Sequence, residues 1–211
     1  MPVIDVQVSG ANSEDAREAA GSVGLSNEAI VDATNEYFAM RWTGIVIPVG
    51  ATITTAWIDM YIIDDTGDDP NHTIYFEDNA TPATFVNSAN NISSRTPTTA
   101  TALLSSTNLG ATATGGWLSS FVSMPFPELK TIIQELVDSY DYSGGGAMVA
   151  IIRGSADGAR DLRRTDWSTD TTLAAKLHIE YITGGGGGSL IRSVFADNDV
   201  HGVLFGGQVV R

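Results

Sequence analysis

The fold class is decided by one stretch, Thr52-Ile53-Thr54-Thr55-Ala56-Trp57-Ile58-Asp59-Met60-Tyr61-Ile62-Ile63. It is rich in β-branched and aromatic residues and runs into a cluster of turn-forming residues, which is typical of a strand. The segment before it, residues 38–47, places Phe38, Met40 and Trp42 on one face, and Pro48-Val49-Gly50 supplies a turn between the two. This part of the chain therefore predicts two consecutive strands.

Further strands are expected on both sides of this pair. The segments are Thr73–Glu77, Ala147–Arg153 and Ala175–Ile182, with an opening strand carrying Ile4, Val6 and Val8. In the last long segment, apolar and polar residues alternate, which is the pattern of a half-buried antiparallel strand. That alternation places His178 on the outward-facing side, so we expect a surface histidine.

One helix is expected, over residues 127–140. Its apolar residues fall on one face of a helix and are Leu129, Ile132, Ile133, Leu136, Val137 and Tyr140. Pro127 suits a first helical turn, and Glu128 suits the positive end of the helix. Ser143-Gly144-Gly145-Gly146 would stop it. The span 96–116 is rich in Thr, Ala and Ser with weak periodicity, which predicts a loop crossing over the sheet.

Strands, one helix and strands again, without an alternation of strand and helix, predict an all-β fold. We expect a single antiparallel β-sandwich of jelly-roll type over residues 1–183, with one amphipathic helix. No repeat of 20–50 residues is visible in the sequence, which argues against solenoids and propellers. A chain of 211 residues is long enough to bury a core without a disulfide or metal.

Composition narrows the classes of function. The chain has no cysteine, which excludes disulfides, thiolate metal sites and a cysteine nucleophile. The formal charge of −14, without an offsetting basic cluster, argues against direct nucleic-acid binding. The N-terminus has no basic segment followed by an apolar run, and no stretch approaches the ~20 apolar residues of a membrane span. These features predict a soluble chain without a signal peptide or membrane segment.

The C-terminal part differs from the rest of the chain. Five consecutive glycines, Gly184–Gly188, are expected to behave as a flexible linker. Residues 189–211 then form a second apolar segment that is too short for a core of its own. We interpret 189–211 as an assembly arm, here called the C-terminal arm, that docks through Leu190, Ile191, Val194, Phe195, Val203, Leu204, Phe205, Val209 and Val210.

Four segments together resemble a known kind of module. They are Gly50–Tyr61, Pro125–Val137, Tyr142–Met148 and Ala174–Tyr181. In this combination they are similar to a jelly-roll β-sandwich module, itself like carbohydrate-binding modules, of tailed-phage virion proteins and environmental surface proteins. The resemblance covers about residues 1–182, with Tyr142 where Trp is common and Gly145 where Asn is common. It implies the fold and a structural or adhesive role, and no chemistry.

Candidate binding residues are few. The acidic loop at 64–72 could offer Asp64, Asp65, Asp68 and Asp69 to a calcium ion. The spacing is not that of an EF-hand, and a solvated turn between strands is the simpler interpretation. The sequence contains no hydrolase, metalloprotease or phosphate-loop motif, so we expect no enzyme and no cofactor.

Tryptophans are the remaining candidates for a binding role. We expect Trp42 and Trp57 in the core, because they lie within strand patterns. Trp117 and Trp167 lie among polar residues and could contact a glycan or a partner protein.

From these observations we expect a non-enzymatic phage virion protein, either a capsid decoration protein or a tail or baseplate component. It would form homo-oligomers or bind other virion proteins through the C-terminal arm. The alternative is a carbohydrate-binding module or adhesin.

Overall fold

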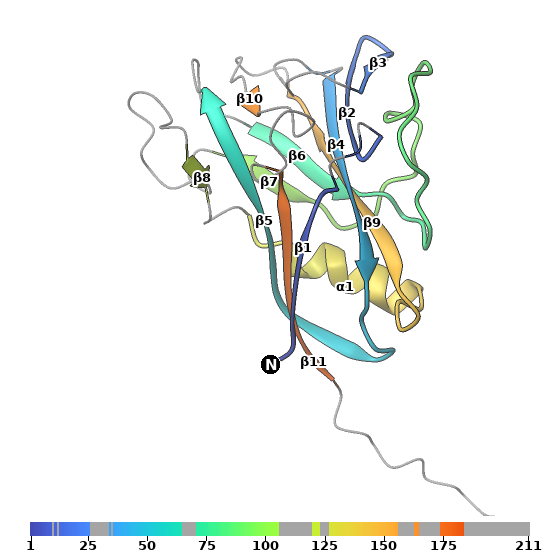
Figure 1. Ribbon diagram of the computed structural model, residues 1–211, viewed down its shortest axis with the longest axis vertical. Coiled ribbons are helices and arrows are strands. Elements are labelled where there is room, and N and C mark those ends of the chain that lie inside the picture. Colours follow the sequence, from blue (N-terminus) through green and yellow to red (C-terminus); the bar gives the residue numbers. More distant parts are fainter. Residues whose placement is uncertain are drawn as a thin grey trace, which may run out of the picture.

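The structure is a computed structural model of the chain. It describes residues 1–9, 11, 13–25, 34, 36–64, 71–105, 120–122, 127–155, 163–164 and 174–183. Within this part the fold is an all-β sandwich of two sheets with one short helix (Figure 1). The predicted fold class is therefore confirmed at this level.

The two sheets are here named after their long strands. The β5 sheet has the order β1 (Val3–Gln7), β11 (Lys176–Thr183), β5 (Ala51–Asp64) and β10 (Arg163–Arg164), and β8 (Ser120–Val122) also pairs with β5. The β4 sheet has the order β3 (Ser22–Gly24), β2 (Asp15–Ala19), β4 (Glu36–Ile45), β9 (Gly146–Arg153), β6 (Asn71–Phe76) and β7 (Ala102–Ser105). Every pairing recorded among these strands is antiparallel.

The chain passes repeatedly from one sheet to the other. The strands β1, β4, β5, β6, β7, β8, β9 and β11 can be counted in chain order as first to eighth. In this count the order of strands in the β5 sheet is first, eighth, third, sixth. The order in the β4 sheet is second, seventh, fourth, fifth. Such crossing between two antiparallel sheets is what double-sheet β folds built from Greek keys require. The jelly-roll topology itself stays a prediction.

The main core lies between the two sheets. Phe38, Met40 and Trp42 all belong to it, as their predicted common face requires. Trp42 is 0% exposed, its indole Nε1–H donates to the backbone oxygen of Ala175 at 3.2 Å, and its ring stacks with that of Phe76. This contact joins β4 to the residues that lead into β11, so the core ties the two sheets together.

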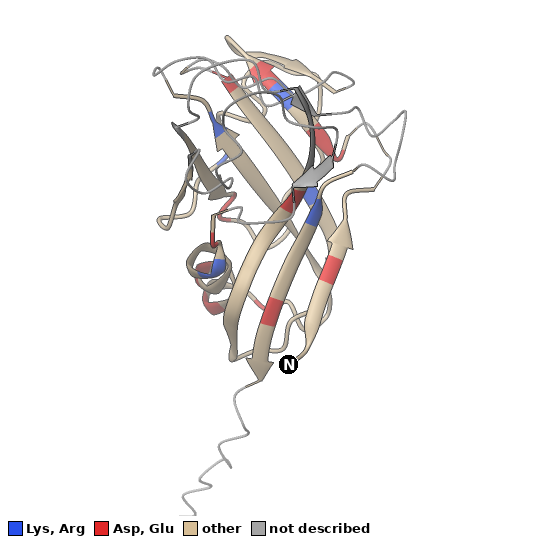
Figure 2. Cartoon of the chain, turned by 90° about the vertical axis from the view of Figure 1, so that its left-hand side faces the viewer, with Lys and Arg blue, Asp and Glu red and all other residues tan. Residues whose placement is uncertain are grey.

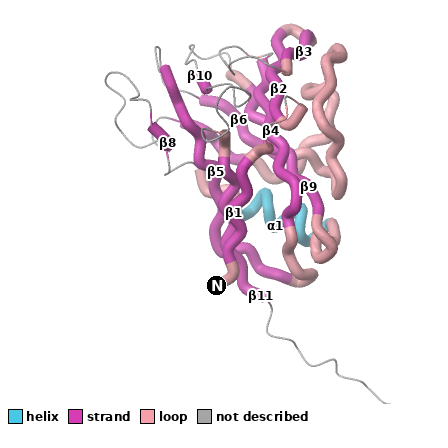
Figure 3. Tube along the Cα trace, viewed as in Figure 1, coloured by secondary structure: helices cyan, strands magenta, loops and turns pink. Residues whose placement is uncertain are grey.

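A second, smaller cluster lies on the other face of the β4 sheet. Ala39, Val149 and Ile151 point to this side, where Phe85 and Ile92 of the loop 77–101 cover them. The loop is drawn in pink beside β4 and β9 in Figure 3. Strand β9 is therefore buried on both faces, which accounts for its nearly continuous apolar sequence.

One arginine makes several of the contacts that hold the loop 77–101. The Arg95 guanidinium is paired with the Glu77 carboxylate and donates to the backbone oxygens of Ala83, Thr84 and Asn91. It also lies over the Phe85 ring, 4.5 Å from its centroid. The loop is thus fixed by polar contacts around a side chain that is 7% exposed.

Helix α1 (Lys130–Ser139) is the predicted helix with a later start. Its buried residues are Ile132, Ile133, Leu136 and Val137, as the periodicity predicts. The expectation that Pro127 occupies the first turn is wrong, because Pro127 and Glu128 precede the helix. The Glu128 carboxylate instead accepts hydrogen bonds from the N–H groups of Lys130, at 3.0 Å, and of Ala56 on β5, at 2.7 Å.

Helix α1 also covers an edge of the β5 sheet. The Gln134 amide accepts from the Ile53 N–H at 2.7 Å and donates to the Ala51 oxygen at 3.2 Å, and the Leu129 N–H donates to the Ala56 oxygen at 2.8 Å. A buried backbone group left without a partner costs about 1–3 kcal/mol. An uncovered sheet edge also invites pairing with another chain. Helix α1 therefore satisfies these backbone groups and blocks pairing of this edge with another chain.

Several strands were not predicted. The expectation of a loop over 96–116 is wrong for Ala102–Ser105, which form β7 and pair with β6. Strands β2, β3, β8 and β10 also go beyond the sequence prediction, and all four are short. The long predicted strands all exist, with shifts of one or two residues at their ends.

Candidate functional site

Most of the exposed large hydrophobic residues belong to segments that lie at one end of the sandwich. Seven large hydrophobic residues are exposed within the described part of the chain, and five of them, here called the arm-exit patch, are Met1, Val3, Val46, Val49 and Ile182. Met1 and Val49 are the most exposed, at 74% and 72%. Single exposed apolar residues are ordinary, whereas a gathered set marks an interaction surface.

Pairing between strands brings these residues together. The Tyr181 N–H donates to the Pro2 oxygen at 3.2 Å, which places the N-terminus beside the end of β11. Thr183, the last residue of β11, pairs with Ala51, the first residue of β5 after the turn that carries Val46 and Val49. Figure 1 shows the N-terminus, the end of β11 and this turn at the same end of the molecule.

The turn between β4 and β5 is firmly supported. The Ile47 N–H donates to the Tyr142 oxygen at 3.3 Å, and the Ala51 N–H closes the turn on the Pro48 oxygen at 3.1 Å. The Tyr142 ring is buried beneath it, and burial raises the pKa of the Tyr142 hydroxyl above its ordinary value. The turn therefore presents Val46 on a rigid base.

The outer edge of β1 lies beside the arm-exit patch. Pro2 bonds to Tyr181, and Val8 bonds to Ala175 at 2.9 Å. Because bonded pairs alternate along an antiparallel ladder, the backbone groups of Val3 and Asp5 point away from β11. The described residues provide no recorded hydrogen-bond partner for these two backbone positions. The edge is therefore open at Val3 and Asp5.

The outer face of the β5 sheet carries an aromatic pair. Trp57 lies between buried Ala56 and Ile58 on β5, so it faces outward and is only partly buried. Trp57 is therefore not one of the fully buried core residues expected from the sequence, but is partly buried and packs against the main core cluster. Its indole stacks on the imidazole of His178, directly opposite on β11, with ring centroids 3.6 Å apart.

Carboxylates surround this pair. His178 Nδ1 lies 2.6 Å from the Asp5 carboxylate, His178 Nε2 lies 3.4 Å from the Glu180 carboxylate, and the Trp57 Nε1–H donates to Asp59 at 3.0 Å. His178 faces outward as predicted, but its side chain is 13% exposed because these neighbours cover it. Figure 2, which turns this side of the molecule toward the viewer, shows acidic positions on neighbouring strands. The outer face of the β5 sheet therefore presents an indole ring and carboxylate oxygens that can accept hydrogen bonds.

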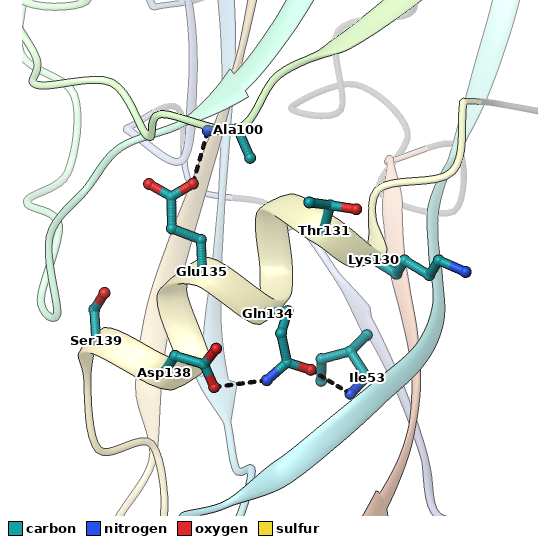
Figure 4. A pocket seen from close by; sticks show the side chains of 8 residues that line it. All are labelled: Ile53, Ala100, Lys130, Thr131, Gln134, Glu135, Asp138 and Ser139. Carbon is teal, nitrogen blue, oxygen red and sulfur yellow. Dashed lines mark hydrogen bonds between the residues drawn. The ribbon is translucent and has the colours of Figure 1, made fainter.

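A third feature is an open groove along helix α1, with a volume of about 560 Å³. Its lining residues are Ile53, Ala100, Lys130, Thr131, Gln134, Glu135, Asp138 and Ser139 (Figure 4). The Glu135 carboxylate accepts from the N–H groups of Thr99 and Ala100, both at 2.7 Å, and Gln134 bonds to β5 and to Asp138. These polar side chains hold the helix to β5 and to the loop 77–101, which is a structural role for the groove.

Most of the predicted site residues lie outside the described residues. These are all nine named residues of the C-terminal arm, Trp117, Trp167, Asp65, Asp68 and Asp69. Asp64 is the last residue of β5, and its backbone pairs with Arg163. Within the part that the structure describes, no group of three or more acidic or histidine side chains is arranged to hold a metal ion.

Neither the scan against protein-family models nor the search of curated proteins produced a match. Among the described residues, no helix has the length and apolar character needed to cross a membrane.

Proposed function

We propose that this chain is a non-enzymatic structural protein of a phage virion, a capsid decoration protein or a tail or baseplate component, that assembles through its C-terminal arm. The observation that carries this proposal is the position of the arm-exit patch. Five exposed apolar residues belong to the segments that meet at the end of β11, after which the glycine linker and the arm follow in the sequence. Burial of apolar surface is the main favourable term in association, so this end is suited to contact another subunit.

The sequence adds two supports. The arm carries many apolar residues on a flexible linker, which links bound copies at high effective concentration. The charge of −14 keeps free copies apart until specific contacts form. The virion assignment itself rests on the resemblance of about residues 1–182 to modules of phage virion and surface proteins.

The test compares the full chain with a version ending at Thr183. We expect the full chain to self-associate in light scattering over a concentration series and the shortened chain to be a folded monomer. Circular dichroism confirms that the shortened chain keeps its β structure, which is expected because β11 ends at Thr183. Self-association of the shortened chain, or a monomeric full chain, would contradict an assembly arm that joins copies.

A second candidate function is carbohydrate binding at Trp57. The observation that favours it is an outward-facing indole that donates to Asp59 and stacks on His178, beside which lie the carboxylates of Asp5 and Glu180. An aromatic face packs on the apolar face of a sugar ring, and carboxylates accept hydrogen bonds from hydroxyl groups.

This candidate predicts a separate pattern of results. Titration of the full chain with cellohexaose, xylohexaose and maltohexaose, followed by tryptophan fluorescence, should show saturable binding to at least one. Trp57→Ala should weaken that binding at least about tenfold, which corresponds to about 1.4 kcal/mol. Removal of residues 189–211 should leave it unchanged. Absence of binding to all three sugars would remove the support for this candidate.

A further inference from the structure

We infer that the outer edge of β1 and the arm-exit patch together form the acceptor for the C-terminal arm of a second copy of this chain. The inference rests on the proposed function and names the surface that the arm binds. In this arrangement part of the arm adds a strand to β1, and its apolar side chains cover the patch.

The two edges of the β5 sheet differ in whether their backbone groups are covered. The edge of β5 between Ala51 and Ala56 is closed by α1, through Gln134, Glu128 and Leu129. β1 is the edge strand at the other side of the same sheet, and its backbone groups at Val3 and Asp5 point outward. Strand addition satisfies such groups with main-chain hydrogen bonds. The described part of the β5 sheet therefore offers β1 as its acceptor edge.

Exposed apolar side chains lie beside that edge. Val3 lies on β1 itself, Met1 precedes it, and Ile182 lies on the neighbouring strand β11. An added strand on β1 would bring alternate side chains of the arm over these residues. The arm supplies apolar side chains at alternate positions, such as Val203 and Phe205. Apolar surface on both partners is thereby removed from water.

The linker sets how far the C-terminal arm can reach from the end of β11. The five-glycine linker starts directly after Thr183 and has a root-mean-square span of about 12 Å. When two copies meet at their arm-exit ends, both linkers begin at the contact between the copies, since each β11 ends beside the N-terminus of its own chain. The two patches then face each other as one self-complementary surface, which is the usual geometry of a twofold dimer. Exchange of arms between the two copies fills both acceptors at once.

Introduced thiols test the location directly, because the chain has no cysteine of its own. A Val3→Cys chain is mixed under mild oxidation with chains carrying Val194→Cys, Val203→Cys or Val209→Cys. A disulfide requires α-carbons within about 7 Å. We expect at least one arm position to yield a disulfide-linked dimer with Val3→Cys. Val86→Cys, an exposed position in the loop 77–101, should yield none.

Matched charge substitutions test the patch. Val46 and Val86 are both 50% exposed, and only Val46 belongs to the arm-exit patch. Val46→Asp should raise the dissociation constant of the full chain at least about tenfold, because a carboxylate in an apolar contact is costly. Val86→Asp should change it less than about twofold, as distant surface substitutions do. Equal effects of the two would contradict a contact at the patch.

The outcomes separate the inference from the proposed function. If the chain ending at Thr183 still associates, the proposed function fails. If it is monomeric but no arm position links to Val3→Cys in mixed chains, the function stands and the acceptor is wrong. If linking occurs only within a single chain that carries both changes, the arm folds back on its own domain. That result would mean that the acceptor binds the arm of its own chain and not the arm of a second copy, which overturns the inference.

Discussion

Arg95→Ala is expected to lower the free energy of unfolding by about 3–5 kcal/mol, the cost of removing one partner of a buried ion pair. Arg95 is almost fully buried together with Glu77. Its guanidinium also donates to the backbone oxygens of Ala83, Thr84 and Asn91. The substitution leaves the Glu77 carboxylate with the Asn79 amide as its remaining side-chain donor and removes the donors to Ala83, Thr84 and Asn91.

The consequence extends to the sheet beneath the loop. Phe85 and Ile92 cover the outer face of the β4 sheet, and Arg95 lies over the Phe85 ring. Loss of the loop would expose Val149 and Ile151 of β9 to water. Urea denaturation of the chain ending at Thr183 measures the effect without the arm. Arg153→Ala, at an exposed position of β9, is the control and should stay within about 0.5 kcal/mol of the parent.

Trp42→Ala is expected to cost about 3–5 kcal/mol, as truncation of a fully buried aromatic side chain does. The indole fills the core between the sheets, stacks with Phe76 and donates to the Ala175 oxygen. The comparison variant is Trp57→Ala, at a partly buried outward position, which should cost about 1–2 kcal/mol.

The pair of variants tests the two faces of the β-sandwich. Both remove an indole from a central strand, so differences in residue type cancel. The free energies of unfolding come from urea titrations followed by circular dichroism, which does not depend on tryptophan emission. Equal losses for the two variants would mean that the assignment of Trp42 to the core and Trp57 to the outer face is wrong.

Much of the fold could be predicted because long elements carry strong patterns. The run at 52–63 is a strand with its turn in front of it, and the alternation at 175–182 marks both the strand and its inward face. Helix α1 was visible from its apolar stripe. These patterns arise because each element must bury one face against the same core.

The short strands could not be predicted from local sequence. β7 has four residues, Ala102–Ser105, in a region rich in Thr, Ala and Ser, and it is a strand because β6 supplies its hydrogen-bond partners. The start of α1 was also misjudged. Glu128 is used for a bond to Ala56, a residue far away in the sequence, and such a contact leaves no local signal.

The candidate surface was predictable only in part. The linker and the apolar arm are evident in the sequence. The arm-exit patch is not, because Met1, Val46 and Ile182 come from three separate segments that strand pairing brings together. Trp57 was misassigned for a related reason. A central strand buries alternate residues, and only the buried neighbours Ala56 and Ile58 fix which set faces inward.

The position of β11 has a mechanical consequence. The strand lies between β1 and β5, pairs with both, and continues directly into the linker. A pull transmitted through the arm acts along the strand, at right angles to its hydrogen bonds. Such a load shears the bonds of both ladders together instead of peeling them apart one by one. The sandwich is thus attached to its linker through a strand that resists force along its length.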